Sequence, residues 1–120
     1  MKNKEFLSLL QAVVQHWQSS ANAYKNYMEN GKKFCYAEVL KVHNSAVNNL
    51  LKENISAIPQ NLRKDADALI EHYTIWSAKW DELKNSLNPR PDDEFVFQND
   101  HRFPRQAAQN LEAVLKDHSF

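Results

Sequence analysis

The sequence has 120 residues, of which 42% are hydrophobic and 25% charged, a length and composition that predict one soluble domain with a single core. Its 15 basic and 15 acidic residues balance, which disfavours nonspecific binding to nucleic acid or to a membrane surface. One glycine and four prolines are too few for the turns of an all-β fold, and a single cysteine excludes an intramolecular disulfide and favours a reducing compartment.

The N-terminal segment lacks the features of a signal peptide. An apolar run over residues 6–14 follows a basic start, but Ser8 and Gln11 interrupt it and no small-residue cleavage pattern follows. No stretch approaches the roughly 20 apolar residues that a membrane-spanning helix needs. We therefore expect a cytoplasmic protein without a membrane partner.

The first predicted helix covers residues 3–28, where apolar residues recur every three or four positions. That stripe consists of Leu7, Leu10, Val14, Trp17, Ala21, Tyr24 and Met28, widened by Phe6, Val13 and Tyr27. The opposite face carries the amides Gln11, Gln15, Gln18, Asn22 and Asn26. This face is either an ordinary solvated surface or a polar contact surface for a partner.

The second predicted helix covers residues 33–54 and runs antiparallel to the first, because Asn30 and Gly31 leave only a short link. Two adjacent apolar stripes indicate a helix that is contacted on two sides. One stripe is Tyr36, Leu40, His43, Val47 and Leu50, and the other is Cys35, Val39, Val42 and Ala46. We expect His43 to be a core imidazole that is bonded to a tyrosine hydroxyl or to a carbonyl.

The third predicted helix, residues 60–87, has the most regular pattern of the chain. Pro59 separates it from the second helix, so these two also run antiparallel. Its apolar stripe is Leu62, Ala66, Leu69, Tyr73, Trp76, Trp80, Leu83 and Leu87. On so continuous a stripe, the two tryptophans are predicted to be core residues rather than a platform for nucleobases.

A long connection precedes the fourth predicted helix. Residues 88–94 form a proline-rich acidic turn, residues 95–97 are aromatic and partly extended, and Pro104 opens a helix that ends near His118. At about 1.5 Å per residue this helix is about 22 Å long, against about 40 Å for the third. It therefore leaves part of the groove between the other helices uncovered, and either the connection or a partner fills that part.

These elements predict an all-α protein: residues 1–120 form a single four-helix, mostly antiparallel bundle with a long, partly extended connection between helices 3 and 4. We predict no catalytic residue, no metal site and no cofactor. The five histidines include no pair three or four residues apart and no Glu-x-x-His motif, which bundle metal sites use. The chain also lacks the glycine-rich elbow of serine hydrolases.

The expected function is therefore that of a small non-enzymatic protein that docks on another protein, as an inhibitor, an immunity or antitoxin-like factor, or an assembly subunit. Its predicted contact residues lie in the connection and at the start of the fourth helix, because phenylalanine and arginine are favoured at interfaces. They are Phe95, Phe97, Asp100, His101, Arg102 and Arg105.

Several alternatives stay open at this point. The connection and the start of the fourth helix are equally compatible with a solvated loop whose phenylalanines enter the core and whose arginines pair with Asp92, Asp93 or Glu94. A second function is the handling of a ligand or phosphate by Arg102, Arg105 and His101. A third is that of a helical subunit of a nucleoprotein complex, although nucleic acid is the less favoured partner. A homodimer also stays open.

Overall fold

The structure is a computed structural model that describes residues 2–97 and 102–117, with side chains from Lys4 onward. Its elements are α1 (Lys2–Glu29), α2 (Phe34–Glu53), the short 3-10 helix η1 (Ile55–Ala57), α3 (Gln60–Leu87) and α4 (Arg105–Asp117). The predicted all-α four-helix bundle is confirmed. None of the described helices has the length and apolarity that crossing a membrane requires.

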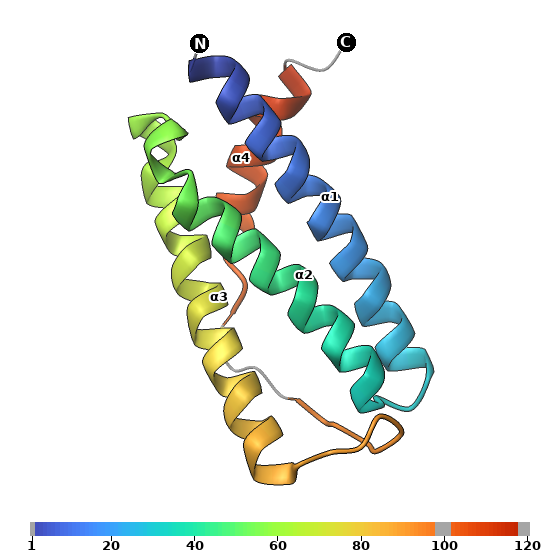
Figure 1. The fold of residues 1–120 in the computed structure, drawn as a ribbon. Coiled ribbons are helices and arrows are strands. Elements are labelled where there is room, and N and C mark those ends of the chain that lie inside the picture. The colour runs from blue at the N-terminus through green and yellow to red at the C-terminus, as the bar shows by residue number, and fades with distance from the viewer. Residues whose placement is uncertain (1, 98–101, 118–120) are drawn as a thin grey trace.

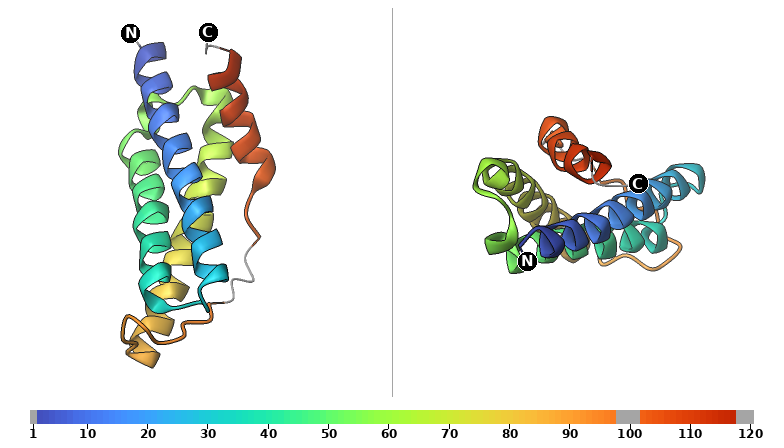
Figure 2. Two further views of the ribbon diagram at one scale, coloured as in Figure 1. Left: turned by 90° about the vertical axis from the view of Figure 1, so that its right-hand side faces the viewer. Right: turned by 90° about the horizontal axis from the view of Figure 1, so that it is seen from above.

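The four helices alternate in direction around a ring (Figure 1). Here α2 and α4 lie on opposite sides of the pair formed by α1 and α3 (Figure 2). The end of the bundle that holds the N-terminus and α4 is called the upper half, and the end with the α1–α2 link is called the lower half. Because α4 has 13 residues and α1 and α3 have 28 each, α4 covers its side of the bundle only in the upper half.

Left-handed residues end two of the long helices. Gly31, the only glycine of the chain, has φ 76° in the link after α1, and Lys32 follows with φ 54°. At the end of α3, Asn88 has φ 46° and its N–H donates a 2.8 Å hydrogen bond to the carbonyl of Lys84. Both positions match the usual left-handed termination of a helix.

The core has two parts that differ in composition. The upper part is mainly aliphatic and includes Leu10, Val13, Val47, Leu51, Leu69 and Leu111, which have no exposed surface. The lower part is mainly aromatic and includes Tyr27, Phe34, Trp76, Trp80 and Phe95. The predicted core position of the two tryptophans is therefore confirmed, whereas Leu87 at the end of the same stripe is 51% exposed.

The stripe predicted for α1 is wrong in the lower half of the bundle. There Tyr24 is 54% exposed, Met28 is 45% exposed and Ala21 is also exposed, whereas Ala23, which the prediction left out, is buried beside the predicted Tyr27. The reason is the short α4, which does not reach this part of α1. With no fourth helix beside it, the lower half of α1 buries the side that faces α2 and the connection.

The second stripe predicted for α2 is also wrong. Val39 is 43% exposed and Val42 is 63% exposed, so none of the described helices covers α2 at these two residues. The environment of His43 differs as well, because the hydrogen bond that this half-buried side chain forms within the described residues is to another histidine. Its Nδ1 atom lies 3.0 Å from Nδ1 of His16 on α1.

Candidate binding groove

A groove opens between α1 and α3 in the part of the bundle that α4 leaves uncovered. Its volume is about 870 Å³. Ala37, Leu40 and Asn44 of α2 form its floor, and α1 and α3 form its walls. The end of the connection and the start of α4 border its upper end. This is the uncovered groove that the difference in helix length predicts.

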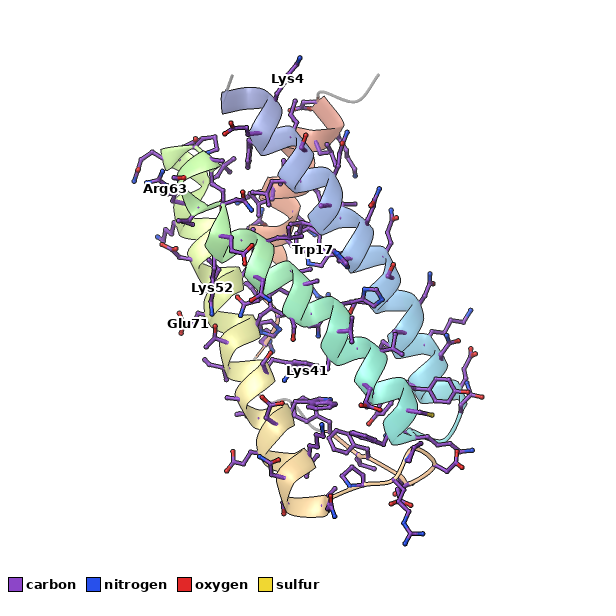
Figure 3. All side chains as sticks on the ribbon, in the orientation of Figure 1. Lys4, Trp17, Lys41, Lys52, Arg63 and Glu71 are labelled. Carbon is purple, nitrogen blue, oxygen red and sulfur yellow. The ribbon has the colours of Figure 1, made fainter. Side chains whose placement is uncertain are left out.

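Aromatic side chains form most of the groove walls. They are Trp17, Tyr24 and Tyr27 of α1, Tyr73, Trp76 and Trp80 of α3, and Phe97 and Phe103 of the connection. Trp17 points from α1 toward the interior of the bundle (Figure 3), and its Nε1–H donates a 2.8 Å hydrogen bond to the hydroxyl of Tyr73. All three tryptophans of the chain line the groove, so intrinsic fluorescence reports on its occupancy.

The Tyr73 hydroxyl is a neutral polar group in the wall. Burial raises the pKa of Tyr73 from 10.0 to about 12, although the hydrogen bond from Trp17 acts in the opposite direction. The hydroxyl therefore keeps its proton at physiological pH. It accepts a hydrogen bond from the indole and still has a proton to donate.

A few further polar groups lie among these rings. The Ser20 hydroxyl donates a 3.0 Å hydrogen bond to Oδ1 of Asn44, which is 9% exposed. His72 is 5% exposed, and its ring lies 5.2 Å from that of Phe103. Nε1 of Trp80 is buried and has no acceptor among the described residues. An N–H left in this state costs about 1–3 kcal/mol.

Two arginines occupy the upper rim of the groove. Arg102 and Arg105 are both exposed and line it. In the described part of the chain neither forms an ion pair, so the alternative pairing with the acidic turn is not observed there. Arg105 is the first residue of α4, whose first turn contains no acidic residue. The N-terminus of a helix is itself partly positive, so it adds to the charge of the two arginines at the rim. Glu112, two turns further along α4, also lines the groove.

Hydrogen bonds hold the connection against the lower half of the bundle. The N–H of Phe95 donates a 2.8 Å bond to the carbonyl of Lys32. The hydroxyl of Tyr27 donates to the carbonyl of Phe95 and accepts a 3.2 Å bond from the N–H of Phe97. Burial raises the pKa of Tyr27, so this hydroxyl also stays protonated. One tyrosine of α1 therefore helps to hold both phenylalanines in position.

The two phenylalanines predicted as contact residues have different environments. Phe95 has no exposed surface, and its ring centroid lies 5.1 Å from that of Phe34 and 5.2 Å from that of Trp80. It is thus a core residue with no surface to offer a partner. Phe97 is half-buried, and its ring lies 5.3 Å from Trp76 in the groove wall. The connection fills the lower end of the groove and leaves the rest open.

The other predicted contact residues are only partly described. Arg102 and Arg105 lie together at the groove rim, whereas Asp100 and His101 lie outside the described residues. Sequence reasoning missed the α1 wall, because it assigned Tyr24 to the core. The available signal was the part of the α1 stripe that extends beyond the reach of the short fourth helix.

Comparison of the chain with family models, with curated proteins and with solved structures found no match. Within the described residues, no group of three or more His, Cys, Asp or Glu side chains is arranged to hold a metal ion. The function is therefore inferred from the groove itself.

Proposed function

We propose that this is a non-enzymatic binding protein that docks on another protein by receiving an amphipathic helix of that protein in the groove. The observation that carries this proposal is the exposed lower part of the α1 stripe, Ala21, Tyr24 and Met28, beside the groove. A full-length fourth helix would cover these residues. A partner helix would supply the missing length and bury its apolar face in the groove.

The dimensions of the groove limit the helix that it receives. The lining runs from Trp17 to Tyr27 on α1 and from His72 to Trp80 on α3. At about 1.5 Å per residue, these segments are about 15 Å and about 12 Å long. They match two to three turns of helix, with apolar anchors at about positions i, i+3 or i+4, and i+7.

The rim favours a partner helix with acidic residues at the end that approaches α4. Arg102 and Arg105 add two positive charges to the positive N-terminus of α4, and no carboxylate of the described chain pairs with them. Carboxylates on the partner would neutralise this charge through charge-assisted hydrogen bonds. An arginine that is a hot spot of such an interface contributes about 2 kcal/mol or more to binding.

The test is an affinity comparison with the partner captured from the native lysate. We expect Tyr24→Ser to remove an exposed apolar contact and to weaken binding at least about tenfold, with unchanged melting. We expect the same of Arg102→Ala, since exposed charges contribute roughly 0–1 kcal/mol to stability. Leu87→Ser is the matched control, because Leu87 is similarly exposed (51%) but does not line the groove.

Capture of a protein from the lysate is not sufficient support. Unchanged affinity in Tyr24→Ser and Arg102→Ala would contradict the proposal, and so would an equal loss in Leu87→Ser. In either case the contact surface lies elsewhere on the molecule.

A second candidate is a small aromatic anion bound in the groove, with its acidic group on Arg102 and Arg105. The volume of about 870 Å³ and the two rim arginines favour it, since small-molecule sites of about 300–1,000 Å³ are common. A fluorescence and melting screen with aromatic carboxylates and phosphates tests this candidate. Quenching that saturates, with a matching rise in Tm that Arg102→Ala abolishes, would favour the ligand over the helix.

A further inference from the structure

The side of the bundle away from α4 contains an unusually charge-poor surface. Residues 6–24 of α1 include no Asp, Glu, Lys or Arg, although a stretch of that length would contain about five at the average of 25% for this chain. Residues 42–51 of α2 also include none. These two segments pack side by side (Figure 1).

A contact between two histidines marks the middle of this surface. Nδ1 of His16 and Nδ1 of His43 are 3.0 Å apart, and the ring centroids are 5.3 Å apart. The rings therefore point these nitrogens at each other, and one nitrogen donates a hydrogen bond to the other. Both residues lie near the midpoints of their helices, α1 at Lys2–Glu29 and α2 at Phe34–Glu53.

Small and apolar side chains surround the histidine pair. Val39 and Val42 are 43% and 63% exposed, and Ala46 is half-buried next to them on α2. Two lysines of α2 turn away from this side. Lys41 pairs with Asp81 of α3, and Lys52 also points toward α3 (Figure 3). Depletion of charge around exposed apolar residues is the compositional signature of an interface core.

We infer that this α1–α2 face is the interface of a symmetric dimer, in which it packs against the same face of a second copy of the chain. Its chemistry is self-complementary. The exposed amides on the outer side of α1, such as Gln15 and Asn22, are both donors and acceptors and can pair with their own copies. A face dominated by one sign of charge would instead repel its copy.

The size of the face also fits a dimer. At about 1.5 Å per residue, residues 6–24 are about 28 Å long, and two helices packed about 8–10 Å apart present a surface about 20 Å wide. This gives roughly 550 Å² per copy, which is the size of a weak dimer interface. A two-fold axis near His16 and His43 would bring the central residues of each helix beside their copies.

The dimer is independent of the groove, which α1, α3 and the start of α4 border. In Figure 2, α4 lies on the opposite side of the α1–α3 pair from α2. Sedimentation velocity between about 1 and 200 μM tests the dimer. We expect the wild type to approach twice its mass of 14.0 kDa as concentration rises. Val42→Glu should remain monomeric, because it places like charges at the centre of the symmetric interface. Leu87→Glu, which adds the same charge at an exposed leucine of α3, should dimerise like the wild type.

Cross-linking provides a second readout that does not depend on affinity. In a Cys35→Ser background, Val42→Cys should form a disulfide-linked dimer on mild oxidation, while Leu87→Cys should not. A wild type that stays monomeric throughout the range would overturn the inference. Equal dimerisation of Val42→Glu and the wild type, or equal cross-linking at both cysteine positions, would also overturn it.

Discussion

The two halves of the bundle have cores of different composition, aliphatic in the upper half and aromatic in the lower half. Four helices enclose the upper half, and aliphatic residues such as Leu69 and Leu111 fill it without exposed surface. Three helices and the connection enclose the lower half, and large rings such as Trp80 and Phe95 fill it. Aliphatic side chains interlock between evenly spaced helices. Where the fourth helix is missing, a few large rings span the wider space, and the groove is what they leave open.

The sharpest test of this comparison is Trp80→Ala, which removes the central ring of the lower half. Trp80 is 3% exposed, stacks on Phe34 at 5.7 Å and lies under Nζ of Lys41 at 4.9 Å. We expect a loss of about 3–5 kcal/mol of unfolding free energy, the usual cost of truncating a buried large aromatic residue. Chemical denaturation measures this loss.

Leu87→Ala is the control for that measurement, since Leu87 belongs to the same helical stripe but is exposed. It should change stability by no more than about 0.5 kcal/mol. Near-normal stability of Trp80→Ala would contradict the aromatic packing of the lower half.

Helical periodicity was sufficient to predict the four helices but not which face each of them buries. The α3 stripe from Leu62 to Trp80 is buried as predicted, because α3 has neighbours along that length. On α1 and α2 the apolar stripes include residues that no neighbouring element buries, such as the exposed Tyr24 and Val42. Periodicity reports which residues share a face, whereas burial depends on whether another element lies beside that face.

The candidate site was predictable only through Phe97, its two arginines and the length of the fourth helix. Phe95 and Phe97 are two residues apart, and the sequence alone could not assign one to the core and the other to the groove wall. That difference depends on the long-range hydrogen bonds of Tyr27. The hydrogen bond between Ser20 and Asn44 in the groove was equally unpredictable from the sequence, because it joins residues 24 positions apart on two different helices.

Alkaline pH tests the boundary between the two halves through Tyr73. Burial raises its pKa from 10.0 to about 12, so the folded state holds the proton more tightly than the unfolded state. The stability that this provides is complete below about pH 10 and is lost as pH rises toward 12. At about 1.4 kcal/mol per pKa unit, the loss is up to about 2.7 kcal/mol.

Denaturation curves at several values of pH measure this loss, and Tyr73→Phe should reduce its slope. Tyr24→Phe is the control, because Tyr24 is 54% exposed and should keep the slope of the wild type. Identical slopes in all three proteins would mean that the Tyr73 hydroxyl is not buried as described.

A smaller effect is expected when the connection loses its anchor on α1. Tyr27→Phe leaves the ring in place but removes the hydroxyl that bridges the carbonyl of Phe95 and the N–H of Phe97. We expect a loss of about 1–2 kcal/mol, as for other buried groups that lose a partner. Hydrogen exchange should quicken at Phe97 and remain unchanged at Leu69 in the upper half. Uniform quickening at both sites would mean that the two halves unfold as one unit.

The smallest effect, and the most discriminating for function, is expected from Arg105→Glu. Arg105 is exposed and stands at the first position of α4, where its positive charge opposes the helix dipole. A carboxylate at this position favours the dipole, so the substitution should stabilise the upper half by about 0.3–1 kcal/mol. The same change reverses the charge at position 105 of the groove rim, and binding of an acidic partner helix should therefore fall.

Arg90→Glu is the control, since Arg90 is an exposed arginine of the acidic turn that does not line the groove. Melting curves beside affinities for the two variants separate the effects. A more stable Arg105→Glu protein that binds its partner as tightly as the wild type would show that the rim arginines do not contribute to recognition.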